Sequence, residues 1–246
     1  MIIKVISICS AVDFLEKLKN LEEEHREREK EGRGPGHPTT FRGQRECKPL
    51  LPSLTRPEGP GVHEEERIIK EFRRRIYSQP SDRMHMWEVV IIGQHYRLPT
   101  RLLDWTESPL VALFFAVQGK TEKDKDGRNI DSVVIGTHHH RLFVTDLREE
   151  AGEVPWSIRK TGPYFFIPDY SNERIFPQRS VLSVWQDPTT PFEELSNVEV
   201  WQFKIPAFNR GDIQAELDKI GINEETLFPG LEGVSKYLAW KFMPRR

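Results

Sequence analysis

The strongest constraint on the fold is a block of nine consecutive apolar residues that runs from Pro109 to Val117. Ser108 is predicted to cap the N-terminus of a helix here, and Pro109 fits the first helical position. A helix that is apolar on every side must be buried, and this block is far shorter than the ~18 residues that span a bilayer. The chain must therefore surround the helix with a core, and we expect no membrane partner.

The composition supplies enough apolar material for such a core. Hydrophobic residues make up 37% of the 246 residues, and 36 Lys and Arg nearly balance 38 Asp and Glu. A chain of this length buries about 70–75% of its unfolded surface, which argues against wholesale disorder. The net charge of −2 argues against binding nucleic acid by bulk charge. Cys9 and Cys47 are too few for a disulfide framework and are not spaced as a zinc pair, so we expect a reducing, cytoplasmic setting.

The order of the predicted elements indicates an α+β fold. A strand at residues 2–8 leads into an amphipathic helix from Asp13, and residues 1–38 end in a charged linker rich in Gly and Pro. Residues 39–246 are predicted to form one globular unit, with residues 1–21 packed on it. N-terminal helices should pack on a largely antiparallel sheet, followed by short C-terminal helices. We expect helices at 64–77, 83–96 and 109–119, strands at 131–137, 141–147, 164–168, 174–185 and 198–206, and helices at 213–220 and 234–242.

The first candidate site is the segment Phe41-Arg42-Gly43-Gln44. Arg42 and Gln44 offer fixed hydrogen-bond donors that suit a phosphate or a carboxylate. Gly43 between them lets the backbone turn or lets a ligand approach closely. The alternative interpretation is that Arg42 braces the carboxylate of Asp104 or of another buried acid.

The second candidate site is the polar string at residues 94–106, which lies between two apolar elements. A buried arginine and a buried aspartate must be paired. The sequence therefore predicts one ion pair, which joins Asp104 to either Arg101 or Arg42. His95 in the same string is either a general base or a histidine satisfied at the C-terminus of a helix.

Five segments of the chain follow one another in an order that is known from a protein family. They are FRGQ, LLPSLTR, QHYRLPTRLLDWTESPLVALFFA, ERIFPQRSVLSVW (with Arg174, Ile175 and Gln178) and LFPGLEGVSKYLAWKF. Together they cover most of residues 39–243 and resemble the FRG domain, a family named for its aromatic-Arg-Gly motif. Arg97 is a departure, because the family commonly has a small residue such as glycine there. The resemblance implies a bacterial or phage protein with a role in defence or toxicity.

The chain also shows a distant likeness to ADP-ribosyltransferases, which have a mixed β-core. Those enzymes hold NAD with an arginine or histidine at the end of an early strand, and by that likeness Arg42 would hold NAD. They also use a late glutamate to stabilise an oxocarbenium-like transition state. Glu173, Glu199 and Glu232 are candidates with no motif to choose between them, and the alternative is that Gln178 marks a family without this acid. A likeness at the level of the fold does not establish an activity.

Three other patterns are interpreted as structural. The first pattern is the histidine run at residues 138–140. Only alternate residues of a strand share a face, so at most His138 and His140 could hold one ion. We therefore expect His138, His139 and His140 in a solvated turn. Residues 32–38 contain three glycines but lack the Gly-Lys-Ser/Thr ending of a phosphate-binding loop, so they are interpreted as linker. The basic residues at 70–75 lie beside glutamates and are interpreted as a solvated helix face.

The leading hypothesis is an FRG-domain protein whose polar pocket binds a nucleotide-like ligand and transfers or cleaves it, with NAD as the candidate cofactor. The catalytic candidates are His95, Arg42 and Asp104, and no metal is assigned. The ligand-binding candidates are Arg42, Gln44, Arg101, Trp105, Thr106 and Gln178. Within this set, Trp105 is the candidate to stack on a base or a nicotinamide ring. Two alternatives stay open: a metal-dependent nuclease that uses His95, Asp104 and Glu107, and a non-catalytic binding or sensor module in which the motif braces the fold. A protein or nucleic-acid target is also left open.

Overall fold

The computed structural model describes residues 2–30, 39–76, 84–119, 123–138, 146–158, 162–168, 175–196 and 198–242. Several predictions fall outside these ranges. They concern the Gly- and Pro-rich linker at 31–38, nearly all of the strand at 141–147, and His139, His140, Glu173 and Arg174.

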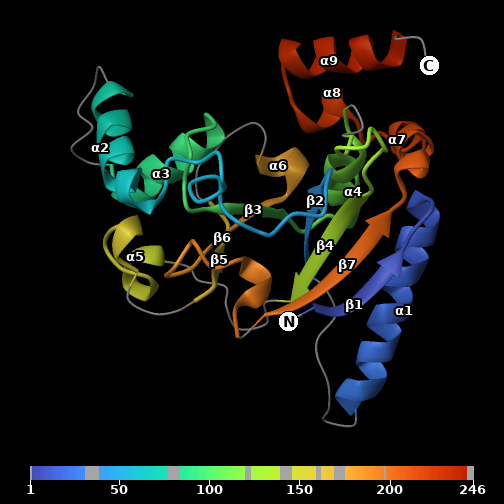
Figure 1. Ribbon diagram of the computed structural model, residues 1–246, viewed down its shortest axis with the longest axis horizontal. Coiled ribbons are helices and arrows are strands. Elements are labelled where there is room, and N and C mark those ends of the chain that lie inside the picture. The colour runs from blue at the N-terminus through green and yellow to red at the C-terminus, as the bar shows by residue number, and fades with distance from the viewer. Residues whose placement is uncertain are drawn as a thin grey trace.

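A mixed, mostly antiparallel sheet of seven strands forms the centre of the described structure, which confirms the α+β fold (Figure 1). Neighbouring strands pair antiparallel except at one edge, where the first strand runs parallel to the last one in sequence. In spatial order the strands are β1 (Ile2–Ser7), β7 (Glu199–Ile205), β4 (Ser132–His138), β2 (Thr40–Gln44), β3 (Leu103–Thr106), β6 (Ser180–Val184) and β5 (Tyr164–Phe166).

The apolar helix predicted from the sequence is α4 (Pro109–Val117), and it is buried as expected. The Ser108 hydroxyl accepts a hydrogen bond from the Val111 backbone N–H at 3.4 Å, so Ser108 caps the helix. Two further helices, α1 (Ala11–Lys30) and α7 (Arg210–Lys219), share one hydrophobic core with α4 and the sheet. Phe14 of α1 belongs to this core and lies edge-on to Phe203 of β7, with ring centroids 4.9 Å apart.

A second core lies at the other end of the sheet, where α2 (Glu65–Arg75), α3 (Met86–His95) and α5 (Leu147–Glu150) pack (Figure 1). Ile69 of α2 is fully buried in this core. The basic residues on the outer face of α2 pair with glutamates one turn away, as Lys70 does with Glu66 at 2.5 Å. The solvated helix face expected at residues 70–75 is therefore present.

Two expectations about local structure are corrected. Residues 174–185 do not form one strand, because α6 (Ile175–Gln178) precedes β6, and Pro177 has no N–H to donate to a β-ladder. The polar string contains the strand β3. The sequence did not indicate this strand, because β3 is short and its apolar and polar residues do not alternate clearly.

The remaining helices are short or lie near the C-terminus. They are α8 (Glu224–Leu227) and α9 (Leu231–Phe242), with the short 3₁₀ helices η1 (Val62–Glu64), η3 (Pro155–Ser157), η4 (Phe192–Glu194) and η5 (Ala207–Asn209). α9 lies at the outer end of the molecule beside α8 (Figure 1). Among the described helices, none has an apolar stretch long enough to cross a bilayer.

Candidate functional site

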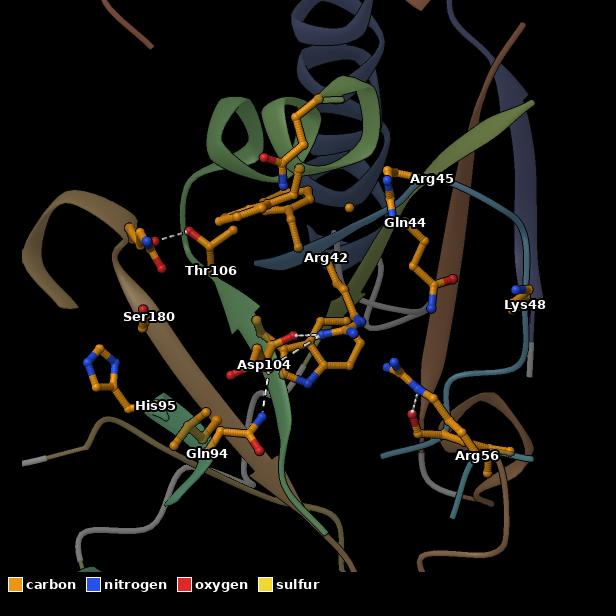
Figure 2. Close-up of a pocket in the computed structure, with 18 of the residues that line it drawn as sticks. Arg42, Gln44, Arg45, Lys48, Arg56, Gln94, His95, Asp104, Thr106 and Ser180 are labelled. Carbon is orange, nitrogen blue, oxygen red and sulfur yellow. Dashed lines mark hydrogen bonds and ion pairs between the residues drawn. The ribbon is translucent and has the colours of Figure 1, made fainter. Parts of the chain in front are cut away.

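The candidate site lies where β2 and β3 stop pairing. These two neighbouring strands are joined by a single residue pair, Phe41 with Thr106. Beyond that pair, residues of both strands line a cavity of about 920 Å³. Figure 2 shows side chains of β2, β3, α3 and the segment after β2 pointing toward this cavity.

Gly43 allows the close packing of α4 and also lines the cavity. A Cβ atom at Gly43 would lie 2.0 Å from the carbonyl oxygen of Ala112 and 2.5 Å from the backbone nitrogen of Ala116. Only glycine lets α4 lie this close to β2. Phe115 of α4 and Gln118, the residue after the helix, line the cavity. The close contact at Gly43 therefore positions one wall of the site.

Arg42 bridges the opening between the two strands. Its Nη1 donates to the main-chain oxygen of Asp104 at 2.6 Å and lies 4.0 Å from Oδ2 of the same residue (Figure 2). The predicted Arg42–Asp104 pair is therefore present, although its main contact is with the backbone. The side chain is 15% exposed, and burial is the main reason why the pKa of Arg42 falls to about 10. Arg42 thus remains cationic at neutral pH.

Asp104 points into the cavity and is held in place by its neighbours. Gln94 of α3 donates from Nε2 to Oδ2 of Asp104 at 2.8 Å, and Oε1 of Gln94 accepts a hydrogen bond from the hydroxyl of Thr100. The Asp104 side chain is 60% exposed. It is an accessible carboxylate with a fixed orientation, so it is well placed to contact a ligand.

Arg101 has a different partner from the one that the sequence suggested. Its Nε and Nη2 donate to the two carboxylate oxygens of Glu65 on α2, at 2.6 and 2.5 Å. The two side chains are 2% and 1% exposed, and Arg101 is not among the residues that line the cavity. Arg101 therefore links α2 to the start of β3 and does not contact the cavity, because its charge is already neutralised in the core.

The stacking role expected of Trp105 is also corrected. Successive residues of a strand point to opposite sides, so Trp105 points away from Asp104 and Thr106. Its indole N–H donates to the Ser183 hydroxyl at 2.8 Å, and its ring packs on Phe192 with centroids 4.9 Å apart. Trp105 borders the cavity, but its ring belongs to the core.

Thr106 and Gln178 line the cavity together and connect β3 to the C-terminal helices. The Thr106 hydroxyl donates to the Gln178 main-chain oxygen at 2.6 Å (Figure 2). Gln178 in turn donates from Nε2 to the main-chain oxygen of Leu227, the last residue of α8, at 2.9 Å. Their hydrogen bonds therefore hold α6 and α8 beside the cavity.

Gln44 and His95 complete the predicted residues that meet at the cavity. His95 is the last residue of α3 and lies near Ser180 in Figure 2. Gln44 follows Arg42 on β2, and its Oε1 is buried with no hydrogen-bond partner in the described part of the chain. Seven of the eight predicted residues thus line one cavity: Arg42, Gln44, His95, Asp104, Trp105, Thr106 and Gln178.

Three cationic residues of the cavity were not predicted. Arg45, Lys48 and Arg56 come from the segment between β2 and α2 and lie together on one side of the cavity (Figure 2). Lys48 pairs with Glu46 at 3.1 Å, and Arg56 donates from Nε to the Leu51 oxygen at 3.1 Å. The available signal was their position: Arg45 directly follows FRGQ, Lys48 comes three residues later, and Arg56 ends the motif LLPSLTR.

The two described acids proposed as a late glutamate, Glu199 and Glu232, do not line the cavity. Glu199 lies on β7 and Glu232 on α9, and neither belongs to the lining, where the acids are Asp104, Glu46 and Glu58. Among the described residues, no three His, Cys, Asp or Glu side chains gather in a group able to hold a metal ion. Glu107 is also absent from the lining, so the geometry does not favour the nuclease hypothesis.

Comparison with known proteins agrees with the motif that begins at Phe41. Residues 37–125 match the model of the FRG domain. This segment matches the FRG domain family. No curated protein and no solved structure matches the chain. The likeness to ADP-ribosyltransferases is therefore not supported by any matching protein. The FRG match contains β2, α2, α3, β3 and α4, whereas the other strands and the C-terminal helices lie outside it.

Proposed function

We propose that the cavity binds a phosphate-bearing ligand of the nucleotide class, and that the protein cleaves or transfers the ADP-ribose unit of NAD there. One observation carries the binding step: the two guanidinium groups of Arg42 and Arg56 face the same cavity. The charge of Arg56 helps to lower the pKa of Arg42. Like charges held close together away from bulk water repel strongly, and an anion between them relieves the repulsion. Planar guanidinium groups suit phosphate oxygens in particular.

Unsatisfied polar atoms at the cavity support the same conclusion. Nε of Arg42 and Oε1 of Gln44 are buried and have no hydrogen-bond partner among the described residues. A buried polar atom without a partner costs about 1–3 kcal/mol. A phosphate that accepts from Arg42 and a ribose hydroxyl that donates to Gln44 would remove both penalties.

The chemical step would use Asp104 and His95. When the bond between ribose C1′ and the nicotinamide nitrogen breaks, nicotinamide leaves as a neutral molecule with the bonding electron pair. The positive charge that develops on the ribose is stabilised by a carboxylate, and Asp104 is held in place by Gln94 at 2.8 Å for that task. Water or an acceptor group then bonds to C1′, and its proton passes to His95 and on to solvent.

The experiment is an assay with NAD labelled in the nicotinamide ring or in the adenylate phosphate, with and without cell extract. We expect nicotinamide release or label transfer by the parent protein and at least a hundredfold loss in Asp104→Asn. Asp126→Asn is the matched control, because Asp126 is an exposed acid outside the cavity, and it should keep full activity. Activity of the parent no greater than that of Asp104→Asn would refute the NAD reaction.

A non-catalytic binding module is the second candidate, and the Arg42 contact favours it. Its 2.6 Å hydrogen bond to a backbone oxygen of β3 is a bracing interaction that needs no chemistry. This candidate predicts that nucleotides bind and remain intact after prolonged incubation. Binding by calorimetry together with analysis of the recovered ligand separates it from the enzyme.

A further inference from the structure

The cavity has two chemically different sides. Figure 2 shows Arg45, Lys48 and Arg56 on one side, and Thr106, Ser180 and His95 on the other, with Arg42 and Asp104 between them. Aromatic and aliphatic residues complete the lining, and they include Phe115, Phe228, Ile91 and Leu182. A ligand that fills such a cavity has an anionic end and an apolar end.

The aromatic part of the lining is built by Phe115 of α4 and Phe228, which follows α8. Their ring centroids lie 6.1 Å apart at an interplanar angle of 89°. Aromatic rings in this edge-to-face arrangement accept a further planar ring by offset or edge contact. Both side chains are only partly buried, so each leaves ring surface at the cavity.

Hydrogen bonds connect the residue before Phe228 to Thr106. Leu227, its neighbour, accepts from Gln178 at 2.9 Å, and Gln178 accepts from Thr106 at 2.6 Å. Thr106 lies across the cavity from Arg56 in Figure 2. The chain of contacts therefore ties the segment that carries Phe228 to the side of the cavity across from Arg56, and Lys236 of α9 lies over the Phe228 ring with Nζ 6.0 Å from its centroid.

We infer that Phe115 and Phe228 form the subsite for the purine ring of a nucleoside diphosphate, whose phosphates lie between Arg42 and Arg56. The inference rests on the proposed function and adds which part of the protein recognises which part of the ligand. Phe228 lies outside the segment matched by the FRG domain, whereas Arg42 and Arg56 lie inside it. The FRG segment supplies the anion site and Phe115, and Phe228, which follows α8, completes the ring subsite.

Calorimetric titration with two probes tests the assignment: ADP, which carries both parts, and inorganic pyrophosphate, which carries the charge alone. We expect the parent to bind ADP at least tenfold more tightly than pyrophosphate. Phe228→Leu keeps the apolar bulk but removes the ring, so it should weaken ADP about tenfold, in the range known for stacking between a base and an aromatic side chain, and leave pyrophosphate unchanged. Phe228→Tyr keeps a ring and should restore the ADP affinity.

Two control variants make the outcomes separable. Phe208→Leu removes a ring that is 82% exposed and outside the cavity, and it should change neither affinity. Arg56→Gln should weaken both probes to a similar degree. If both probes bind but Phe228→Leu leaves the ratio of their affinities unchanged, the ring subsite is wrong and the anion site stands. If neither probe binds the folded parent, the ring subsite and the proposed function both fail.

Discussion

A single backbone angle explains why glycine would suit the position that Arg97 occupies in this chain. Arg97 has a φ of 65°, in the left-handed region, which costs a residue with a Cβ atom ~1–2 kcal/mol. It ends α3 in a Schellman motif, in which Arg97 N–H donates to Gln94 O at 3.0 Å and Leu98 N–H donates to Gly93 O at 2.8 Å. The turn after α3 is therefore formed with a strained backbone at Arg97.

Replacing Arg97 by glycine should therefore stabilise the protein. The relief of strain exceeds the entropy that glycine adds to the unfolded chain, so we expect a gain of ~0.5–1 kcal/mol in the free energy of unfolding. Urea denaturation with an unchanged m-value measures it. Arg97→Ala retains the Cβ atom and should show no gain, and equal stabilities of the glycine and alanine variants would contradict the explanation.

Arg42 and Asp104 should differ in how much stability they carry. Asp104 is 60% exposed and 4.0 Å from Arg42, and exposed ion pairs contribute only about 0–1 kcal/mol. Asp104→Asn should then melt close to the parent while activity falls. Arg42→Met loses the 2.6 Å hydrogen bond to β3, and we expect it to lower the free energy of unfolding by ~1–3 kcal/mol. Calorimetric melting tests both variants. A large loss of stability in Asp104→Asn would assign that carboxylate to the fold.

At the scale of elements, the contact between β2 and α4 depends on one missing side chain. A Cβ atom at Gly43 would overlap backbone atoms of α4, which cannot move aside as a side chain can. We expect Gly43→Ala to destabilise the protein by about 3 kcal/mol or more. Gly211→Ala in α7 is the control, because a Cβ atom there meets nothing within 4 Å, and alanine should stabilise that helix by ~0.5–1 kcal/mol. Thermal unfolding of the two variants should shift in opposite directions.

The ion pair of Arg101 and Glu65 joins α2 to β3 through the core. Glu65→Gln leaves a buried, uncompensated guanidinium, which should cost ~3–5 kcal/mol of stability. Glu66→Gln breaks an exposed pair on the same helix and should cost less than about 1 kcal/mol. The double variant Glu65→Leu with Arg101→Met should recover most of the loss, because no charge is then buried. Guanidinium chloride denaturation compares the three, and equal effects of the two single variants would contradict the assignment.

At the scale of the whole molecule, the FRG match is not a self-contained unit. β2 pairs with β4 along its length, and β3 pairs with β6, but β4 and β6 lie outside residues 37–125. Inside the match, β2 and β3 share one residue pair. We expect a fragment of residues 37–125 to lack cooperative thermal unfolding, whereas the full chain should show it. Calorimetry of both tests this expectation, and a sharp transition in the fragment would contradict it.

The sequence by itself determined the features that depend on neighbouring residues. Ser108, Pro109 and the apolar block predicted a capped, buried helix, because capping and periodicity act within a few residues. The FRGQ and QHY…LDWT motifs also marked Arg42, His95 and Asp104 as candidates, because polar groups set among apolar residues are expensive to bury. Arg42 is indeed largely buried, whereas Asp104 is 60% exposed.

Only the tertiary structure decided which distant groups meet. Glu65 lies 36 residues from Arg101, and nothing local distinguishes it from the other acids of its helix. Trp105 turned into the core because the polar string contains a strand, whose side chains alternate between two sides. The sheet brings distant chain segments together at the cavity. As a result, one side of the cavity carries Arg45, Lys48 and Arg56, and Phe228 joins the aromatic part of the lining. Which residue pairs with which depends on how elements that are far apart in the chain pack together and bury their side chains. A local sequence pattern does not contain that information.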